Sequence, residues 1–294
     1  MKIPAIIRSM LFVPGNRPDR INKALGTKAD VVIIDLEDAV PPNEKADSRR
    51  IVRKKLNELP DRPVFVRING METEFFSKDL EAVVTHALSG LMLPKVETGY
   101  QIEQIHSQLL KLEKTTGIEP GKIPIVPLIE TALGVRNVYL IASDQNKHGR
   151  LLTLSFGAAD FTMDMGMNMT DSGKELDYPR ARIAVACRAA GLRPPIDTPY
   201  MINIKDTASL TTDAERARRL GFQGKLCIHP VQVDICNKVF LPTEEEVTFA
   251  KKVIKAFQSA ESEGVGVIQL NGKFIDLPIL ERARQIVSMD SQAE

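Results

Sequence analysis

Apolar residues in the first 230 positions gather into eight short runs, separated by longer amphipathic stretches. The second run is apolar almost without interruption, which is typical of a strand covered on both faces. The stretches between runs repeat apolar side chains at helical spacing, and several end at a glycine. The pattern predicts strands at residues 9–14, 30–37, 64–69, 91–95, 125–129, 151–156, 195–200 and 224–230.

This alternation of strands and helices predicts a TIM (β/α)8 barrel over residues 1–240. Eight units in roughly 235 residues match that fold in both count and length. The main alternative is a doubly wound open sheet, which usually has a glycine-rich turn after its first strand. Here that turn reads Pro-Gly-Asn-Arg-Pro, and the sequence contains neither a dinucleotide-binding motif nor a P-loop.

Residues 241–294 fall outside the eight units and predict a separate helical and hairpin extension. A long helix is expected over residues 243–261, with Thr243 as its cap. Glycines at 264 and 266 interrupt the pattern. An Asn-Gly pair between two apolar stretches then predicts a hairpin over residues 267–276. A last helix is expected over residues 278–289.

Composition is that of an ordinary globular enzyme, with 43% hydrophobic residues, 26% charged residues and a formal net charge of +1. This balance gives no reason to expect nucleic acid or an acidic membrane as a partner. No run approaches the roughly 18 apolar residues of a membrane helix, and the amino-terminal apolar stretch is too short for a signal peptide. The three cysteines form no C-x-x-C pair, so reduced thiols and a cytoplasmic location are expected.

Two acids, Glu130 and Asp160, follow the fifth and sixth predicted strands. A helix separates these strands, so they should be parallel and should carry both acids to one edge of the sheet. Two converging carboxylates form either a Mg²⁺ site or a general acid/base pair. Residue type favours Mg²⁺, which prefers oxygen ligands. The four histidines have no zinc-ligand spacing, so zinc is not expected.

Other polar residues are expected at the same mouth of the barrel. Arg67 interrupts an apolar strand, where a buried guanidinium needs either a carboxylate neighbour or an anionic ligand. For Lys95, Asp197 and His229, a salt bridge at the rim or a cap is the more ordinary role. The complete set of expected mouth residues is Glu37, Asp38, Arg67, Lys95, Glu130, Asp160, Asp197 and His229.

Seven motifs in order carry a resemblance to a known family. They read RSMLFVPGNRPDR, DLEDAV, VRIN, LPKVE, LIET, FGAAD and GKLCIHP. The sequence resembles the citrate lyase beta-subunit-like group, which includes malyl-CoA and citramalyl-CoA lyases, within the HpcH/HpaI aldolase superfamily. The resemblance extends from about residue 8 to residue 285 and is specific for the family rather than for one substrate.

The resemblance implies a Mg²⁺-dependent carbon–carbon lyase that assembles as a trimer or hexamer. Its reaction would be the reversible, Claisen-type cleavage of a 3-hydroxy-3-carboxyacyl-CoA thioester to a 2-oxo acid and acetyl-CoA. The family's metal ligands fall on Glu130 and Asp160, and Glu130 also contacts substrate. Its catalytic, substrate-binding arginine falls on Arg67.

The family also places a catalytic aspartate near the carboxyl terminus, and this falls on Asp276. In the free-standing lyases that residue reaches the neighbouring subunit, so residues 241–294 are expected to cover an adjacent barrel as a lid. The simpler role for Asp276 is that of a turn residue after the hairpin. Arg17 and Arg20 are expected near the CoA phosphates, although an arginine at a helix start is usually solvated.

Three alternatives remain open at this stage. The chain could be the beta subunit of a citrate lyase complex, which cleaves citryl held on an acyl carrier protein. It could be a pyruvate aldolase that needs no thioester, or an assembly subunit without activity. The set of Arg67, Glu130, Asp160 and Asp276 counts against the last of these, and the preferred acyl group stays open.

Overall fold

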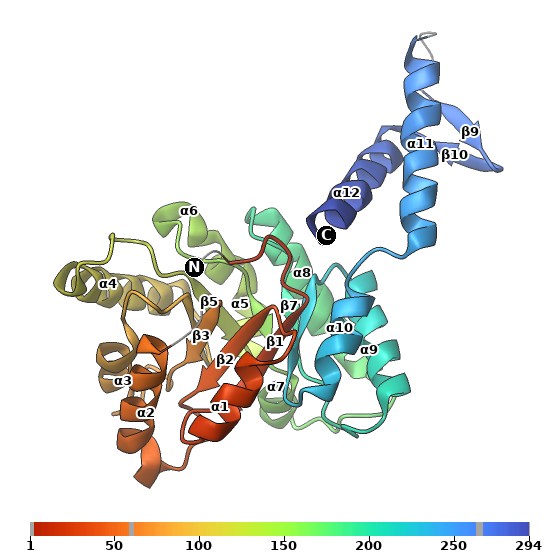
Figure 1. Ribbon diagram of the computed structural model, residues 1–294. Coiled ribbons are helices and arrows are strands. Elements are labelled where there is room, and N and C mark those ends of the chain that lie inside the picture. The colour runs from red at the N-terminus through yellow and green to blue at the C-terminus, as the bar shows by residue number, and fades with distance from the viewer. Residues whose placement is uncertain (1–2, 59–61, 263–266, 294) are drawn as a thin grey trace. The chain divides into compact units, whose positions relative to one another are not determined.

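The first 237 residues form a closed barrel of eight parallel strands in sequential order, which confirms the predicted fold class (Figure 1). The structure is a computed structural model and describes residues 3–58, 62–262 and 267–293. Its strands are β1 (Ser9–Pro14), β2 (Val31–Asp35), β3 (Val64–Arg67), β4 (Gly90–Leu93), β5 (Ile125–Ile129), β6 (Ser155–Phe156), β7 (Ile196–Asp197) and β8 (Gly224–Cys227).

Helices connect consecutive strands and surround the barrel (Figure 1). They are α1 (Pro18–Leu25), α2 (Lys45–Asn57), α3 (Phe76–Val83), α4 (Gly99–Thr116), α5 (Ala132–Ser143), α6 (Gln145–His148), α7 (Ala158–Asp164), α8 (Asp177–Ala189), α9 (Thr207–Arg219) and α10 (Val231–Val239), with short 3-10 turns at Pro42–Glu44 and Lys174–Leu176. Within the described ranges, no helix combines the length and apolarity that crossing a membrane requires.

Alternate residues of the strands fill the barrel interior, as expected where a strand turns successive side chains to opposite faces. These buried side chains are Met10, Val31, Ile33, Phe65, Met92, Val126, Leu128, Ile196 and Leu226, joined by Ile7 just before β1. The interior is therefore a packed core, and polar chemistry is confined to the ends of the strands.

Several predicted elements differ from the observed ones. The sixth and seventh strands are much shorter than predicted; ahead of β6, the Thr153 hydroxyl donates to the carbonyls of Arg193 and Pro194. Helix α10 was not predicted. The charged, amphipathic stretch of residues 43–59 predicts a single helix; it begins as a 3-10 turn and continues as α2, and its last residue, Leu59, lies outside the described residues.

Residues Lys238–Glu294 form a second compact unit with its own small core. Helix α11 (Glu244–Ser262) precedes an antiparallel hairpin of β9 (Ile268–Leu270) and β10 (Lys273–Ile275). The hairpin prediction is confirmed: Asn271 and Gly272 both have positive φ, as the tight turn requires. The predicted glycine break at residues 264–266 lies outside the described residues. Helix α12 (Leu277–Ala293) packs against α11.

A buried ion pair ties α4 to the segment between α6 and β6. The Glu113 carboxylate accepts two hydrogen bonds from Arg150, at 2.8 and 2.9 Å, and two more from the backbone amides of Gly121 and Ile123. Burial tends to raise the pKa of Glu113, but these hydrogen bonds outweigh it and the pKa lies below its usual value. Both side chains are fully enclosed.

Glu113→Gln should therefore destabilise the barrel by about 3–5 kcal/mol, because Arg150 would be left as an uncompensated buried charge. The wild-type contribution should be complete above the ordinary glutamate pKa of 4.5 and should fade as the pH falls through the lower, folded-state value. Urea unfolding at several pH values measures both effects. The control is Glu119→Gln, in an exposed pair with Lys122. Equal unfolding midpoints for the two variants would contradict the role of the pair.

Candidate active site

A cavity of about 380 Å³ lies at the carboxyl ends of the barrel strands. That size is within the range of small-molecule sites. Its apolar lining comes from β1, β5 and β8, through residues such as Phe12, Leu128 and Leu226. Its charged lining consists of Asp35, Asp38, Arg67, Glu130 and Asp160, with Arg67 stacked on the Phe12 ring. The predicted convergence of Glu130 and Asp160 beside Arg67 is therefore present.

Arg67 is held at the end of β3 by carboxylates from the β2 end. Its Nε and Nη2 donate to the two oxygens of Asp35 at 2.7 and 2.6 Å. Its Nη1 lies 3.0 Å from Glu37 and 3.3 Å from Asp38. Burial alone would lower the pKa of Arg67, but these carboxylates raise it above its usual value. The guanidinium is thus permanently charged, with Nε and Nη2 fixed by Asp35 and Nη1 beside Glu37 and Asp38.

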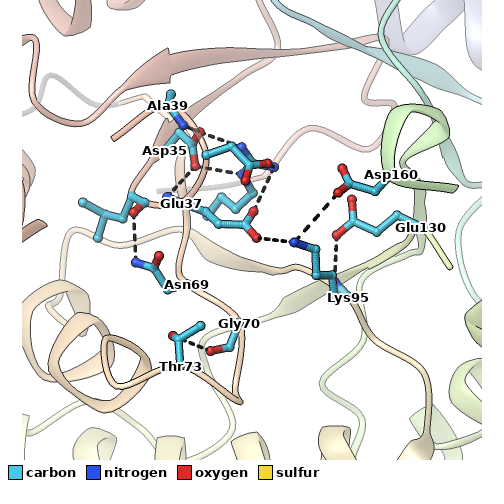
Figure 2. A network of polar contacts seen from close by, with 12 residues as sticks. Asp35, Glu37, Ala39, Asn69, Gly70, Thr73, Lys95, Glu130 and Asp160 are labelled. Atoms are coloured by element: carbon cyan, nitrogen blue, oxygen red, sulfur yellow. Dashed lines mark hydrogen bonds and ion pairs between the residues drawn. The ribbon is translucent and has the colours of Figure 1, made fainter. Parts of the chain in front are cut away.

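Asp35 is a positioning residue that sequence reasoning missed. Its carboxylate accepts hydrogen bonds from the backbone amides of Glu37 and Ala39, at 2.9 and 3.1 Å (Figure 2). It therefore shapes the turn after β2 and orients Arg67 at the same time. The sequence feature that indicates Asp35 is its place as the last, acidic residue of an otherwise apolar strand.

Glu130 follows β5 and depends on a close approach to Gly157. Its Oε1 accepts a hydrogen bond from the backbone amide of Lys95 at 2.8 Å. A Cβ on Gly157 would lie 2.5 Å from Oε2 and 2.7 Å from the Cβ of Glu130, which is too close for either atom. Gly157 is thus required for the observed position of the Glu130 carboxylate.

Lys95 lies between the two sides of the mouth (Figure 2). Its Nζ is 3.6 Å from Glu37 and 3.8 Å from Asp160. Its backbone has a φ of 51°, in the left-handed region that side chains other than glycine seldom adopt. That conformation turns the Lys95 amide toward Glu130. Asp160 itself lies in the first turn of α7, and the Ala158 amide that begins this helix donates to Thr198 Oγ1 at 2.9 Å.

Negative charge exceeds positive charge in this mouth. Five carboxylates (Asp35, Glu37, Asp38, Glu130 and Asp160) face two cations, Arg67 and Lys95. Burial raises the pKa of Glu130 to about 8, and the neighbouring charges of Glu37 and Asp160 add to this shift. Burial likewise raises the pKa of Glu37 to about 7, against the opposing effect of Arg67.

Glu130 and Asp160 fit a hard divalent cation. Both offer only carboxylate oxygen, and the excess negative charge around them is what a bound cation would offset. No cluster of three or more Asp, Glu, His or Cys residues suited to a metal occurs in the part of the chain that the structure describes. Mg²⁺ does not need one, since it commonly uses one or two carboxylates and completes its shell with water and substrate oxygens.

Two other residues expected at the mouth lie elsewhere. Asp197 is fully buried at the end of β7, where it accepts hydrogen bonds from Arg180 and Lys225. Its placement with the mouth acids was wrong, because its side chain pairs with residues of α8 and β8. His229 is exposed and accepts a hydrogen bond from the Val231 amide; the cavity lining includes Ile228 instead.

The remaining predicted residues lie outside the cavity lining. Arg17 and Arg20 are exposed at the start of α1, and Arg17 pairs with Asp19 at 3.4 Å. In the second unit, Asp276 precedes α12, and its Oδ1 accepts a hydrogen bond from the Ile279 amide at 3.3 Å. Asp276 therefore caps this helix.

Comparisons with known proteins point to one family. The model of the HpcH/HpaI aldolase/citrate lyase family matches residues 8–230. Citrate lyase subunit beta of Leuconostoc mesenteroides subsp. cremoris is 37% identical, with 96% of this chain and 92% of that protein aligned. An L-malyl-CoA/beta-methylmalyl-CoA lyase of Cereibacter sphaeroides is 32% identical, with 95% and 93% aligned.

A solved structure is similar along the whole chain. It is CitE from Mycobacterium tuberculosis in complex with magnesium, acetoacetate and coenzyme A. The two structures superpose with a TM-score of 0.80 at 28% sequence identity, and the match covers 98% of this chain and 99% of that one.

Gly157→Ala should weaken Mg²⁺ binding by about 10- to 100-fold, because the added methyl group displaces the Glu130 carboxylate. Isothermal titration calorimetry with MgCl₂ measures the affinity. Gly70→Ala is the matched control, since a Cβ there meets nothing within 4 Å. Unchanged Mg²⁺ affinity in a folded Gly157→Ala protein would show that Glu130 is not a ligand.

Proposed function

The chain belongs to the HpcH/HpaI aldolase/citrate lyase family, and on that premise we propose that it is a Mg²⁺-dependent lyase of 3-hydroxy-3-carboxyacyl-CoA thioesters. The products would be a 2-oxo acid and acetyl-CoA. The family itself supports a carbon–carbon lyase. The acyl group, the carrier and the residue roles below belong to the proposal.

The observation that carries this proposal is the pair of Glu130 and Asp160 beside Arg67, in a mouth where carboxylates outnumber cations. A metal-free pair of general acid and general base would not require carboxylates to outnumber cations around it. Magnesium in the similar CitE structure, together with acetoacetate and coenzyme A, supports the same ligand classes for this mouth. When bound, Mg²⁺ would act as a Lewis acid that polarises the hydroxyl and carboxylate oxygens of the substrate.

The protein side chains would then supply position and charge. Glu130 and Asp160 would hold the cation, and Glu130 would also orient the substrate. Arg67, fixed by Asp35, would present Nη1 to the oxygens that gain negative charge. The apolar lining of Phe12, Leu128 and Leu226 would exclude water from the acyl carbon atoms.

In the cleavage direction the C3 hydroxyl gives its proton to solvent water, and its oxygen becomes the carbonyl of the 2-oxo acid. The C2–C3 bond breaks, and its electron pair passes to C2, giving the thioester enolate. We assign the protonation of C2 to Asp276 of a neighbouring subunit. Its carboxylate would remove the same proton in the reverse reaction. This assignment requires residues 241–294 to serve as a lid on an adjacent barrel in a trimer or hexamer.

The carrier defines the main alternative. Citrate lyase subunit beta of Leuconostoc mesenteroides, at 37% identity, favours a citryl group on an acyl carrier protein. The malyl-CoA lyase at 32% identity favours a free CoA thioester. Arg17 and Arg20 support the CoA proposal, because two exposed arginines just after β1 can pair with phosphates.

A panel of malyl-, methylmalyl-, citramalyl- and citryl-CoA with MgCl₂ tests the proposal directly. Release of glyoxylate, pyruvate or oxaloacetate identifies the acyl group, and EDTA should abolish the release. Glu130→Gln and Asp160→Asn should remove it too, since each loses a cation ligand. Turnover that resists EDTA would contradict metal dependence. Cleavage only after citryl is attached to an acyl carrier protein would select the citrate lyase alternative.

The proposed proton transfer by Asp276 can be tested separately from its capping of helix α12. Asp276→Asn keeps a good capping side chain, whereas Asp276→Ala loses the cap at a cost of about 1 kcal/mol. Both variants should lose about 10²- to 10⁴-fold in thioester cleavage, because neither can transfer a proton. Mg²⁺ affinity should be unchanged in both. Full activity in Asp276→Asn, measured with the preferred thioester, would leave Asp276 only its structural role.

A further inference from the structure

A second cavity of about 380 Å³ adjoins the mouth within the barrel unit. It lies between the segment 169–176, the loop after β7 and helix α9. The two cavities share Thr198, Pro199 and Met201. None of the metal, substrate or carrier roles proposed above uses this second cavity.

Its innermost cation is Arg180, whose side chain is completely enclosed. Nε and Nη2 donate to Asp197 at 2.9 Å each, and Nη2 also reaches Asp213 at 2.8 Å. The third nitrogen, Nη1, is buried and has no hydrogen-bond partner among the described residues. A buried charged donor without an acceptor is unfavourable, so this nitrogen is suited to an acceptor that enters the cavity.

Charged side chains of both signs line the rest of this cavity. Lys174, Arg216 and Arg219 line it together with Arg180, against the carboxylates of Asp171 and Asp213. Asp213 is already engaged by Arg180 and by buried Lys225.

Two of these cations are exposed at the rim. Arg216 is held by Asp177 at 2.8 Å, whereas Arg219 makes a longer contact of 3.9 Å with Glu215, and both side chains of that pair are exposed. Lys174 is exposed as well.

A buried guanidinium with one nitrogen left unpaired by the described residues and two exposed cations at the rim form a set of groups that can bind an oxyanion.

We propose that this cavity is a binding site for a small oxyanion, a carboxylate or a phosphate, separate from the acyl site in the mouth. Arg180 Nη1 would be the fixed donor at its base, and Lys174 and Arg219 would close on the anion from the rim. Because Thr198 lines both cavities and accepts the Ala158 amide that begins α7, the anion would lie beside the loop that supports Asp160.

Titration calorimetry of the full chain without Mg²⁺, using inorganic phosphate and then succinate, tests the site. At least one of the two should bind, and the one that binds identifies the source of the oxyanion. Thr212→Glu places a carboxylate in the cavity and should weaken that binding by at least about tenfold. The matched control is Thr211→Glu, one position along α9 and outside the lining, which should bind as the wild type does.

Arg219→Gln provides a second variant at an exposed position and should also weaken binding. Circular dichroism confirms that each variant is folded. The proposal would be overturned if neither anion binds the wild-type chain. It would equally be overturned if Thr212→Glu and Arg219→Gln bind the anion with wild-type affinity, because the anion would then lie in the mouth or elsewhere on the surface.

Discussion

The chemistry of this barrel depends on a surplus of negative charge held in place at its mouth. Backbone groups keep it there: the turn after β2 fixes Asp35, and the amide of Lys95 fixes Glu130. Burial makes this excess of negative charge unfavourable, and it raises the pKa values of Glu37 and Glu130. A divalent cation bound here would offset this cost and, by doing so, would allow the proposed anionic substrate to enter beside carboxylates that otherwise repel it. Cation and substrate are thus expected to bind in that order.

The barrel and the central pair of acids could be predicted from sequence because both follow from connectivity. Eight apolar runs joined by helices leave few arrangements, and parallel strands bring Glu130 and Asp160 to one edge regardless of side-chain detail. The sequence predicts that Arg67 needs a counter-charge, but it does not indicate which carboxylates supply that charge. Asp197 shows the limit: it is still within β7, and its side chain points to Arg180 and Lys225 rather than into the mouth. Which face an acid takes at a strand end depends on where the strand stops.

Gly157 and the left-handed Lys95 were also beyond sequence reasoning, and for a related reason. Each acts through a close approach between segments far apart in the chain. Gly157 is required because the Glu130 side chain occupies the space of its Cβ, and Lys95 because its amide must turn toward the same carboxylate. Neither requirement leaves a local pattern. A glycine directly after a short strand is the one available hint, and it is shared by many positions with no such neighbour.

The side chains that line the mouth would not distinguish between carriers of the acyl group. Its cation ligands, its arginine and its apolar lining can contact only the acyl end, which is the same whether the thioester is made with CoA or with a carrier protein. Selection between carriers must therefore come from the surface beyond the cavity. Arg17 and Arg20 lie exposed at the start of α1, where the proposed phosphate contacts would add affinity without changing the reacting atoms. Reaction type and carrier preference are thus set by different parts of the barrel, and either can change while the other is kept.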